Sequence, residues 1–329
     1  ASRSVAPPLT MARSSTDRTG SLNLPTIRPT LPVAAVFHAF APDGCAGAPT
    51  RCSNAQMRVF DLPVHRANCW IFNCYLLADP ASDSVVAVDA GLPVVTRRAL
   101  AVLRSEMGRD PGDVAVVAGT HGHPDHVGGI ADLQQVSDAD ALLPQKCSDY
   151  LAGEQPRSFP MLESSVRFMA VWGQQRFEFA GLRDLVATSR RTGFGGASPA
   201  MQTDFAVSGF LGDGDEVPGA AGWVVISSPG HTDDSTCFYH ADSATLLSGD
   251  AVATHDGTPW FNPEYVDLEV SRETEERLRS LEVRHLLPGH GEPVTGRDVW
   301  TRARSADQPP VGKSVLTRCS RRLGRWGRH

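Results

Sequence analysis

The sequence predicts an α/β protein built from layers of strands and helices. Short apolar runs of strand length alternate with segments of helical spacing. Several of these runs end in glycine beside histidine or aspartate. The chain has 329 residues with 41% hydrophobic content, which is enough to bury a core without disulfides. We therefore expect a layered α/β domain that carries its functional residues at strand ends.

The expected elements follow one another between residues 57 and 304. Runs rich in Val, Ile and aromatic residues favour strands, and apolar residues three and four apart favour helices. A polar turn at 65–68 is expected between the first two strands. The expected strands are 57–63, 69–78, 84–88, 114–118, 222–227, 236–240, 244–248 and 283–287, and the expected helices are 96–107, 124–135, 271–281 and 295–304.

The composition changes along the chain and predicts its domain organisation. Residues 1–40, rich in Ser, Thr, Arg and Pro, are expected to form a disordered leader. The domain itself is expected over 41–305. Within it, 150–215 holds seven of the thirteen phenylalanines, and we expect a helical, aromatic insert that caps a site. Residues 306–329 are expected to form a flexible basic tail.

Charge and composition exclude several classes of partner. The net charge of −6 disfavours binding to nucleic acid, and no apolar run is long enough to span a membrane. The seven cysteines are scattered without redox or zinc-ribbon spacing, so we expect reduced thiols in a cytoplasmic protein. Secretion or organelle targeting by the leader is the alternative. A small-molecule substrate is expected, and the sequence leaves a homodimer open.

The stretch GTHGHPDHVGG, residues 119–129, is the strongest functional signal. It follows the apolar run 114–118 and holds three histidines and an aspartate in six positions. His121 and His123 are two apart, so extended backbone turns both toward one point. Pro124 suits the first position of a helix, which turns Asp125 and His126 toward a second point nearby. Buried imidazoles without partners are costly, so the pattern predicts metal binding.

Three further side chains of metal-binding type follow later strands. Each lies beside glycine where a predicted strand ends, in the segments SSPGHTDDS, LLSGD and LLPGHG. The carboxyl ends of strands in α/β folds are where sites usually form. Taken singly, a histidine next to glycine is more often a turn residue than a ligand. Together with the first motif they complete seven candidate ligands: His121, His123, Asp125, His126, His231, Asp250 and His290.

These motifs, in this order, resemble the metallo-β-lactamase superfamily over roughly residues 57–305. The resemblance implies a four-layer αββα sandwich with metals at one edge of its two sheets. It implies that His121, His123 and His231 bind one metal, that Asp125, His126 and His290 bind the other, and that Asp250 bridges them. Asp89, in VDAG, resembles the family's carboxylate behind the ligands, and Thr120 is expected beside it.

The resemblance also implies a reaction. Two divalent ions, zinc or alternatively iron or manganese, activate water as a nucleophile for hydrolysis. Asp125 and Asp250 are then the catalytic carboxylates. We expect a small ester, lactone or thioester with an apolar portion as the substrate. The glyoxalase II and lactonase branches share this ligand set, but the typical tail and tyrosine of these branches are not evident here.

Three alternatives are compatible with the sequence. One is a persulfide dioxygenase on the same framework, with a single iron held by two histidines and an aspartate. The second is a β-lactam-hydrolysing member, although such enzymes carry Cys or Ser at the position of Asp250. The third is a binding protein that keeps the fold. The expected substrate pocket, with plain packing as the competing interpretation, is His255, Trp260, Tyr265, Phe168 and Trp172.

Overall fold

The computed structural model describes residues 58–78, 84–158, 161–192, 201–324 and 326. All of these belong to one compact unit, residues 54–329. The expected leader, residues 1–40, lies outside the described part. No helix in the described ranges is long and apolar enough to cross a membrane.

The first sheet, sheet A, has six strands in the order of the chain. The first three are antiparallel neighbours, and β3 through β6 run parallel. Parallel neighbours place the ends of β4 and β5 at the same edge of the sheet. The strands are β1 (Val64–Cys69), β2 (Phe72–Ala78), β3 (Val85–Val88), β4 (Val114–Ala118), β5 (Asp140–Pro144) and β6 (Val207–Leu211).

The second sheet, sheet B, has five strands in the order β13-β12-β9-β8-β7. β12 and β9 are parallel neighbours, whereas β8 pairs antiparallel with β7 and β9. A separate hairpin joins β10 (Val252–His255) and β11 (Thr258–Phe261). The strands of sheet B are β7 (Trp223–Ser227), β8 (Thr236–His240), β9 (Thr245–Gly249), β12 (His285–Pro288) and β13 (Val294–Thr295).

Both faces of each sheet are buried, because successive side chains along a strand point to opposite faces and both sets pack in a hydrophobic core. In β3, Val86 and Val88 pack between the sheets, whereas Val85 and Ala87 pack beneath helices. In β9, Leu247 lies between the sheets and Leu246 on the outer face. Strands buried on both faces read as continuous apolar runs, which is why the sequence shows these strands clearly.

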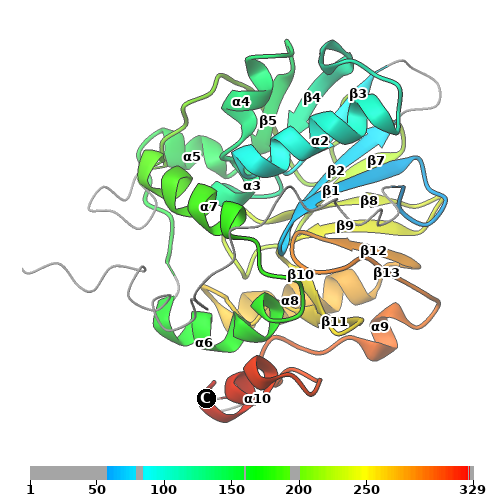
Figure 1. Ribbon diagram of the computed structural model, residues 1–329. Coiled ribbons are helices and arrows are strands. Elements are labelled where there is room, and N and C mark those ends of the chain that lie inside the picture. Colours follow the sequence, from blue (N-terminus) through cyan, green and yellow to red (C-terminus); the bar gives the residue numbers. More distant parts are fainter. Residues whose placement is uncertain (1–57, 79–83, 159–160, 193–200, 325, 327–329) are drawn as a thin grey trace, which may run out of the picture. The chain divides into compact units, whose positions relative to one another are not determined.

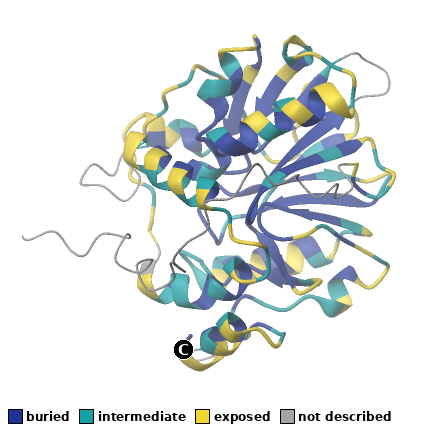
Figure 2. Cartoon of the chain, viewed as in Figure 1, coloured by how far each residue is buried: buried dark blue, intermediate teal, exposed yellow. Residues whose placement is uncertain are grey.

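Helices cover the two outer faces (Figures 1 and 2). α2 (Pro93–Ser105) and α4 (Ile130–Gln134) pack on sheet A, and α8 (Leu268–Arg279) packs on sheet B. The remaining helices are α3 (Pro124–Val127), α5 (Cys147–Leu151), α6 (Met161–Trp172), α7 (Phe179–Arg191), α9 (Val299–Arg302) and α10 (Val315–Leu323), with a short 3₁₀ turn at Pro111–Asp113. The expected four-layer αββα architecture is confirmed.

The first hairpin differs from the sequence prediction. The expected turn at 65–68 is the middle of β1, and the hairpin turns at Trp70, which has a φ of 54°. Polarity suggested a loop, but the side chain of Arg66 is 9% exposed and pairs with Glu292 at 2.7 Å. A tertiary ion pair therefore accommodates polar residues inside this strand.

Other boundaries were also wrong. The expected helix 295–304 is reduced to α9, and α8 begins earlier than expected because Asp267 caps it. The strands β5, β6, β10, β11 and β13 had not been expected. The segment 150–215 is helical in α6 and α7, but it also contributes β6 to sheet A. It is therefore partly integral to the sandwich.

The C-terminal segment, expected to be a flexible tail, contains the helix α10. Ser314 caps this helix by accepting a hydrogen bond from Thr317 N. Thr317 and Ser320 are fully buried, and Ser320 Oγ donates to the Arg167 carbonyl of α6 at 2.7 Å. The basic composition suggested disorder, but contacts with α6 order the helix. Trp326 continues this packing, with its ring 5.6 Å from that of Trp260.

Replacing Trp260 with alanine should destabilise the fold strongly. Trp260 is 1% exposed, so Trp260→Ala should lower the free energy of unfolding by about 3–5 kcal/mol. Urea unfolding followed by circular dichroism measures this. The control is Phe179→Ala, a residue 69% exposed, which should change the value by no more than about 0.5 kcal/mol. Equal effects of the two variants would contradict the packing described.

Candidate metal centre

The histidine-rich stretch forms a strand-to-helix corner, as the sequence predicts. α3 begins at Pro124, and His123 precedes it in extended backbone with φ −68° and ψ 147°. The expected helix 124–135 is two helices, because it is interrupted at Gly128 and Gly129. A Cβ at Gly128 would lie 2.1 Å from Thr188 Cγ2, so glycine here permits close approach of α7.

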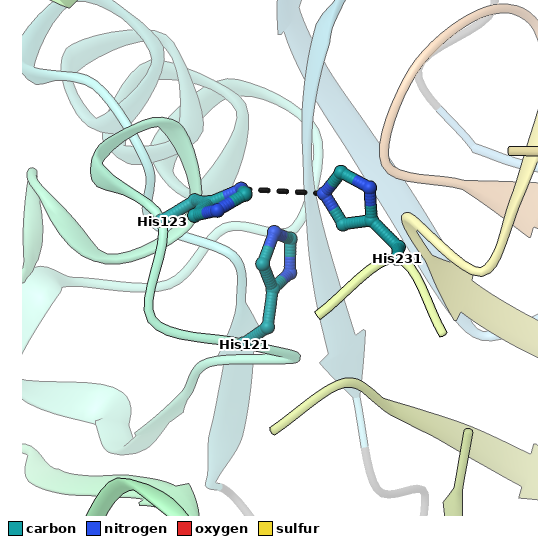
Figure 3. A group of neighbouring side chains, drawn as sticks. All are labelled: His121, His123 and His231. Carbon is teal, nitrogen blue, oxygen red and sulfur yellow. Dashed lines mark hydrogen bonds between the residues drawn. The ribbon is translucent and has the colours of Figure 1, made fainter. Parts of the chain in front are cut away.

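Three histidines form what we call the first group. His121 and His123 come from the corner after β4, and His231 comes from the loop after β7. Figure 3 shows their rings turned toward one another. His231 Nε2 lies 3.3 Å from His123 Nδ1, and the ring centroids of His121 and His123 are 4.6 Å apart. Three imidazoles at this separation form a face suited to one cation.

Asp125, His126 and His290 form the second group. Asp125 and His126 lie on α3, and His290 follows β12. His290 Nε2 is 3.3 Å from Asp125 Oδ2. The ligand atoms of the three residues all lie within 4.8 Å of one another. The fold thus brings together segments that are far apart in the sequence.

Asp250, at the end of β9, stands between the two groups. Its Oδ1 is 3.3 Å from His126 Nε2, and its Oδ2 is 3.5 Å from His231 Nε2 and 3.2 Å from His290 Nε2. One carboxylate therefore faces histidines of both groups. All seven sequence-predicted ligands converge, which is consistent with a dinuclear metal site.

Several polar atoms in this cluster have no hydrogen-bond partner within the described residues. These atoms are His121 Nε2, His126 Nε2 and Asp250 Oδ1, and all are buried. His126 Nε2 and Asp250 Oδ1 are close, but their geometry is not that of a hydrogen bond. A buried polar group without a partner costs about 1–3 kcal/mol. Metal ligation would satisfy all three atoms, so the residues present fit divalent cations.

The electrostatics of the cluster also favour a cation. Burial holds the pKa of His121 well below its usual value, assisted by His126, so this ring is neutral. Burial opposes ionisation of His290, yet Asp250 and Asp125 outweigh it and raise its pKa to about 10. In the metal-free protein, the extra proton on His290 thus offsets the negative charge of the carboxylates of Asp250 and Asp125. Metal ions displace such protons when they bind.

Asp89 and Thr120 lie behind the ligands, as expected. Asp89 is fully buried; its Oδ1 accepts from Thr120 N at 2.8 Å, and its Oδ2 accepts from Thr120 Oγ1 at 3.0 Å. His126 Nδ1 is 2.9 Å from Asp89 Oδ2. This contact fixes the ring so that Nε2 faces Asp250.

Sequence reasoning missed Glu264. Its backbone carbonyl is 2.6 Å from His231 Nδ1, which turns the Nε2 of that ring toward His123 and Asp250. Burial, and then Asp250, raise the pKa of the Glu264 carboxyl to about 8. No residue-type signal identifies a carbonyl contact, since every residue has a carbonyl.

The expected pocket residues fall into different places. Phe168, on α6, contacts His290 with ring centroids 5.5 Å apart. Tyr265 accepts a hydrogen bond from Arg167 Nη1 at 2.5 Å. Two others are buried against the C-terminal segment: His255 Nε2 forms a hydrogen bond with Thr317 Oγ1, and the Trp260 ring packs at a tilt against that of Trp326. Packing therefore accounts for these two.

Trp172, the fifth expected pocket residue, is half-buried at the end of α6. Its backbone carbonyl accepts a hydrogen bond from Trp70 Nε1 at 3.0 Å. This bond fixes the end of α6 to the tip of the first hairpin. Phe72, which had not been expected, contacts His290 with ring centroids 5.5 Å apart.

The fold and these motifs define the family. The model of the metallo-β-lactamase superfamily matches residues 68–290, about two thirds of the chain. The chain belongs to this superfamily. The matched range begins in β1 and ends at His290, so it includes all seven candidate ligands.

Individual proteins are also similar to this chain in sequence or in fold. "Probable metallo-hydrolase YflN" of Bacillus subtilis (strain 168) is 27% identical over 71% of this chain and 86% of its own length. "Uncharacterized protein ML0493" of Mycobacterium leprae (strain TN) is 30% identical over 73% of this chain and 94% of its own length. Among solved structures, metallo-beta-lactamase family protein TTHA1429 from Thermus thermophilus is 22% identical, with a TM-score of 0.48, over 73% of this chain and 76% of that chain.

Gly289→Ala should disrupt the metal centre. A Cβ at this position would lie 2.6 Å from Asp250 Oδ1 and 2.7 Å from His126 Cε1, so the ligands must move. We expect metal affinity to fall by at least about 10-fold. This is the lower end of the range of about 10–100-fold that is typical when the groups that orient a metal ligand are changed. Competition titration against a chromophoric chelator measures it. Gly112→Ala, which adds a Cβ in open space, is the control.

Metal removal should lower thermal stability. Protein dialysed against a chelator should regain Tm when zinc is added, because only the folded state assembles the seven ligands. Zinc at about 100 times its Kd should contribute about 2.7 kcal/mol. Scanning fluorimetry with magnesium as the control ion provides the test. A Tm that is insensitive to zinc would contradict the assignment of this centre.

Proposed function

We propose that this chain is a dinuclear metal-dependent hydrolase that cleaves a small ester, lactone or thioester with an apolar portion. The observation that carries the proposal is the position of Asp250, whose two oxygens face histidines of both groups. Two divalent cations, when bound, would supply polarisation of the scissile carbonyl and a water whose pKa is lowered toward about 7. Superfamily membership and similarity to a protein named as a metallo-hydrolase support this assignment.

The chain's own residues would hold the ions and handle the proton. The first group and Asp250 would hold one ion, and the second group and Asp250 the other. The side chain of Asp125 is 16% exposed, compared with 4% for Asp250. Burial opposes ionisation of Asp125, but His126 and His290 outweigh it and lower its pKa to about 2. Asp125 is thus an ionised carboxylate that is partly exposed to solvent, and we assign it as the proton acceptor.

Aromatic side chains pack against the second group. Phe72, on β2, and Phe168, on α6, both contact the His290 ring edge-on with centroids 5.5 Å apart. Both rings are buried, at 3% and 2% exposed, so they hold the His290 ring in place and do not line an open surface. The apolar portion of the proposed substrate rests on the aromatic composition of residues 150–215, because binding sites for small molecules are lined mostly by such side chains.

The donor set favours zinc. Imidazole nitrogen and carboxylate oxygen are ordinary zinc ligands, and iron or manganese also accept this mixture. Elemental analysis of the purified protein identifies the metal. Two zinc ions per chain would support the hydrolase. One iron per chain with oxygen uptake would overturn it in favour of a mononuclear dioxygenase.

Hydrolysis should depend on Asp250. A panel of p-nitrophenyl esters, lactones and acyl thioesters should contain a substrate that the zinc-loaded protein turns over, and Asp250→Ala should reduce kcat/KM by at least about 100-fold. The control is Asp242→Ala, an exposed carboxylate in the turn after β8, which should leave turnover unchanged. Equal turnover in wild type and Asp250→Ala would overturn the proposal.

A further inference from the structure

The first hairpin holds the loop that carries His290. Asn73, on β2, is 2% exposed. Its Nδ2 donates to the carbonyls of Pro288 at 2.9 Å and Gly291 at 2.7 Å. Its backbone N donates to the Gly289 carbonyl at 3.1 Å. One side chain and its own backbone therefore fix carbonyls on both sides of His290.

These contacts decide where the His290 ring points. The loop backbone cannot rotate while Asn73 bonds both flanking carbonyls. His290 Nδ1 is also 3.3 Å from the Ile71 carbonyl of the same hairpin. The remaining nitrogen, Nε2, is thereby directed at Asp250 and Asp125. The side-chain amide of Asn73 donates to backbone carbonyls, so its effect on the metal groups is on geometry.

A different buried side chain holds the first group. Asp234 is 5% exposed and lies three residues after His231. Its Oδ2 accepts from the backbone N of Gly122 at 2.7 Å and from Cys147 Sγ at 3.2 Å. Gly122 lies between His121 and His123. Asp234 thus links the segment of His231 to the segment that carries the other two histidines.

We propose that Asn73 and Asp234 are positioning residues that act on separate metal sites. Asn73 orients His290 and so sets the affinity of the second group, whereas Asp234 orients the pair His121 and His123 and so sets the affinity of the first. This inference rests on the proposed dinuclear centre. Supports of this kind alter metal affinity by about 10–100-fold when they are removed.

The test is a titration of the metal-free protein with zinc against a chromophoric chelator. His290→Ala and His231→Ala serve as references, because each removes a ligand of one group and so assigns each binding step. We expect Asn73→Ala to weaken the step lost in His290→Ala by about 10–100-fold and leave the other nearly unchanged. Asp234→Ala should show the reverse pattern. Cobalt absorption spectra give a second readout of ligand geometry at each step.

Conservative variants separate positioning from loss of folding. Asn73→Asp has the same shape but no N–H to donate, so it should weaken the second site as Asn73→Ala does. Asp234→Asn keeps an oxygen that can accept from Gly122, so it should retain most of the first-site affinity. Tyr75→Phe and Cys147→Ala are the controls. Tyr75→Phe removes another hydrogen bond to the Pro288 carbonyl but leaves the one from Asn73. Cys147→Ala removes another hydrogen bond to Asp234 but leaves the one from Gly122. Circular dichroism checks that each variant is folded.

The outcomes are distinguishable. If the wild-type protein binds two ions, and the variants weaken both binding steps equally or weaken neither, the positioning roles alone are overturned. Wild-type protein that binds a single ion overturns the dinuclear function as well. Opposite selectivity of Asn73→Asp and Asp234→Ala, with unchanged controls, establishes both roles.

Discussion

The organisation of this protein depends on one electrostatic constraint: the buried carboxylate of Asp250 lies between histidines of the first and second groups. A buried carboxylate needs positive charge close by. His290 supplies that charge as a proton in the metal-free protein, with its pKa raised to about 10. A divalent ion would supply it and would also satisfy His121 Nε2 and His126 Nε2, which have no hydrogen-bond partner in the described structure. Metal binding and the stability of this edge of the sandwich are therefore linked.

The sandwich makes this arrangement rigid. The two sheets pack face to face through side chains such as Val88, Phe238 and Leu247. The ligands lie in the segments that directly follow β4, β7, β9 and β12, so their spacing is fixed by the packing of strands. Gly289 lets the loop of His290 pass directly against Asp250. A rigid frame of this kind suits catalysis, because it holds the charged groups in place before the substrate arrives.

Sequence reasoning succeeded where the signal is local. The run His121 to His126 specifies a corner with two binding points, and the apolar runs of β3, β4 and β9 identify strands buried on both faces. It failed where tertiary contacts outweigh local composition. The polar strand β1 is stabilised by the ion pair of Arg66 with Glu292, and the basic helix α10 is ordered by its packing on α6. Neither partner is a neighbour in the sequence.

The sequence by itself determined the family, the layered fold and the seven candidate ligands, because residue type and spacing within short motifs are enough to specify metal-binding chemistry. Only the tertiary structure decided which residues support those ligands. Asn73 and Asp234 act through backbone groups that are distant in the chain. It also decided that Phe168 faces His290 while Trp260 packs against the C-terminal segment. Such pairings arise when separate segments compete for the same space in the core, and no local pattern encodes that outcome.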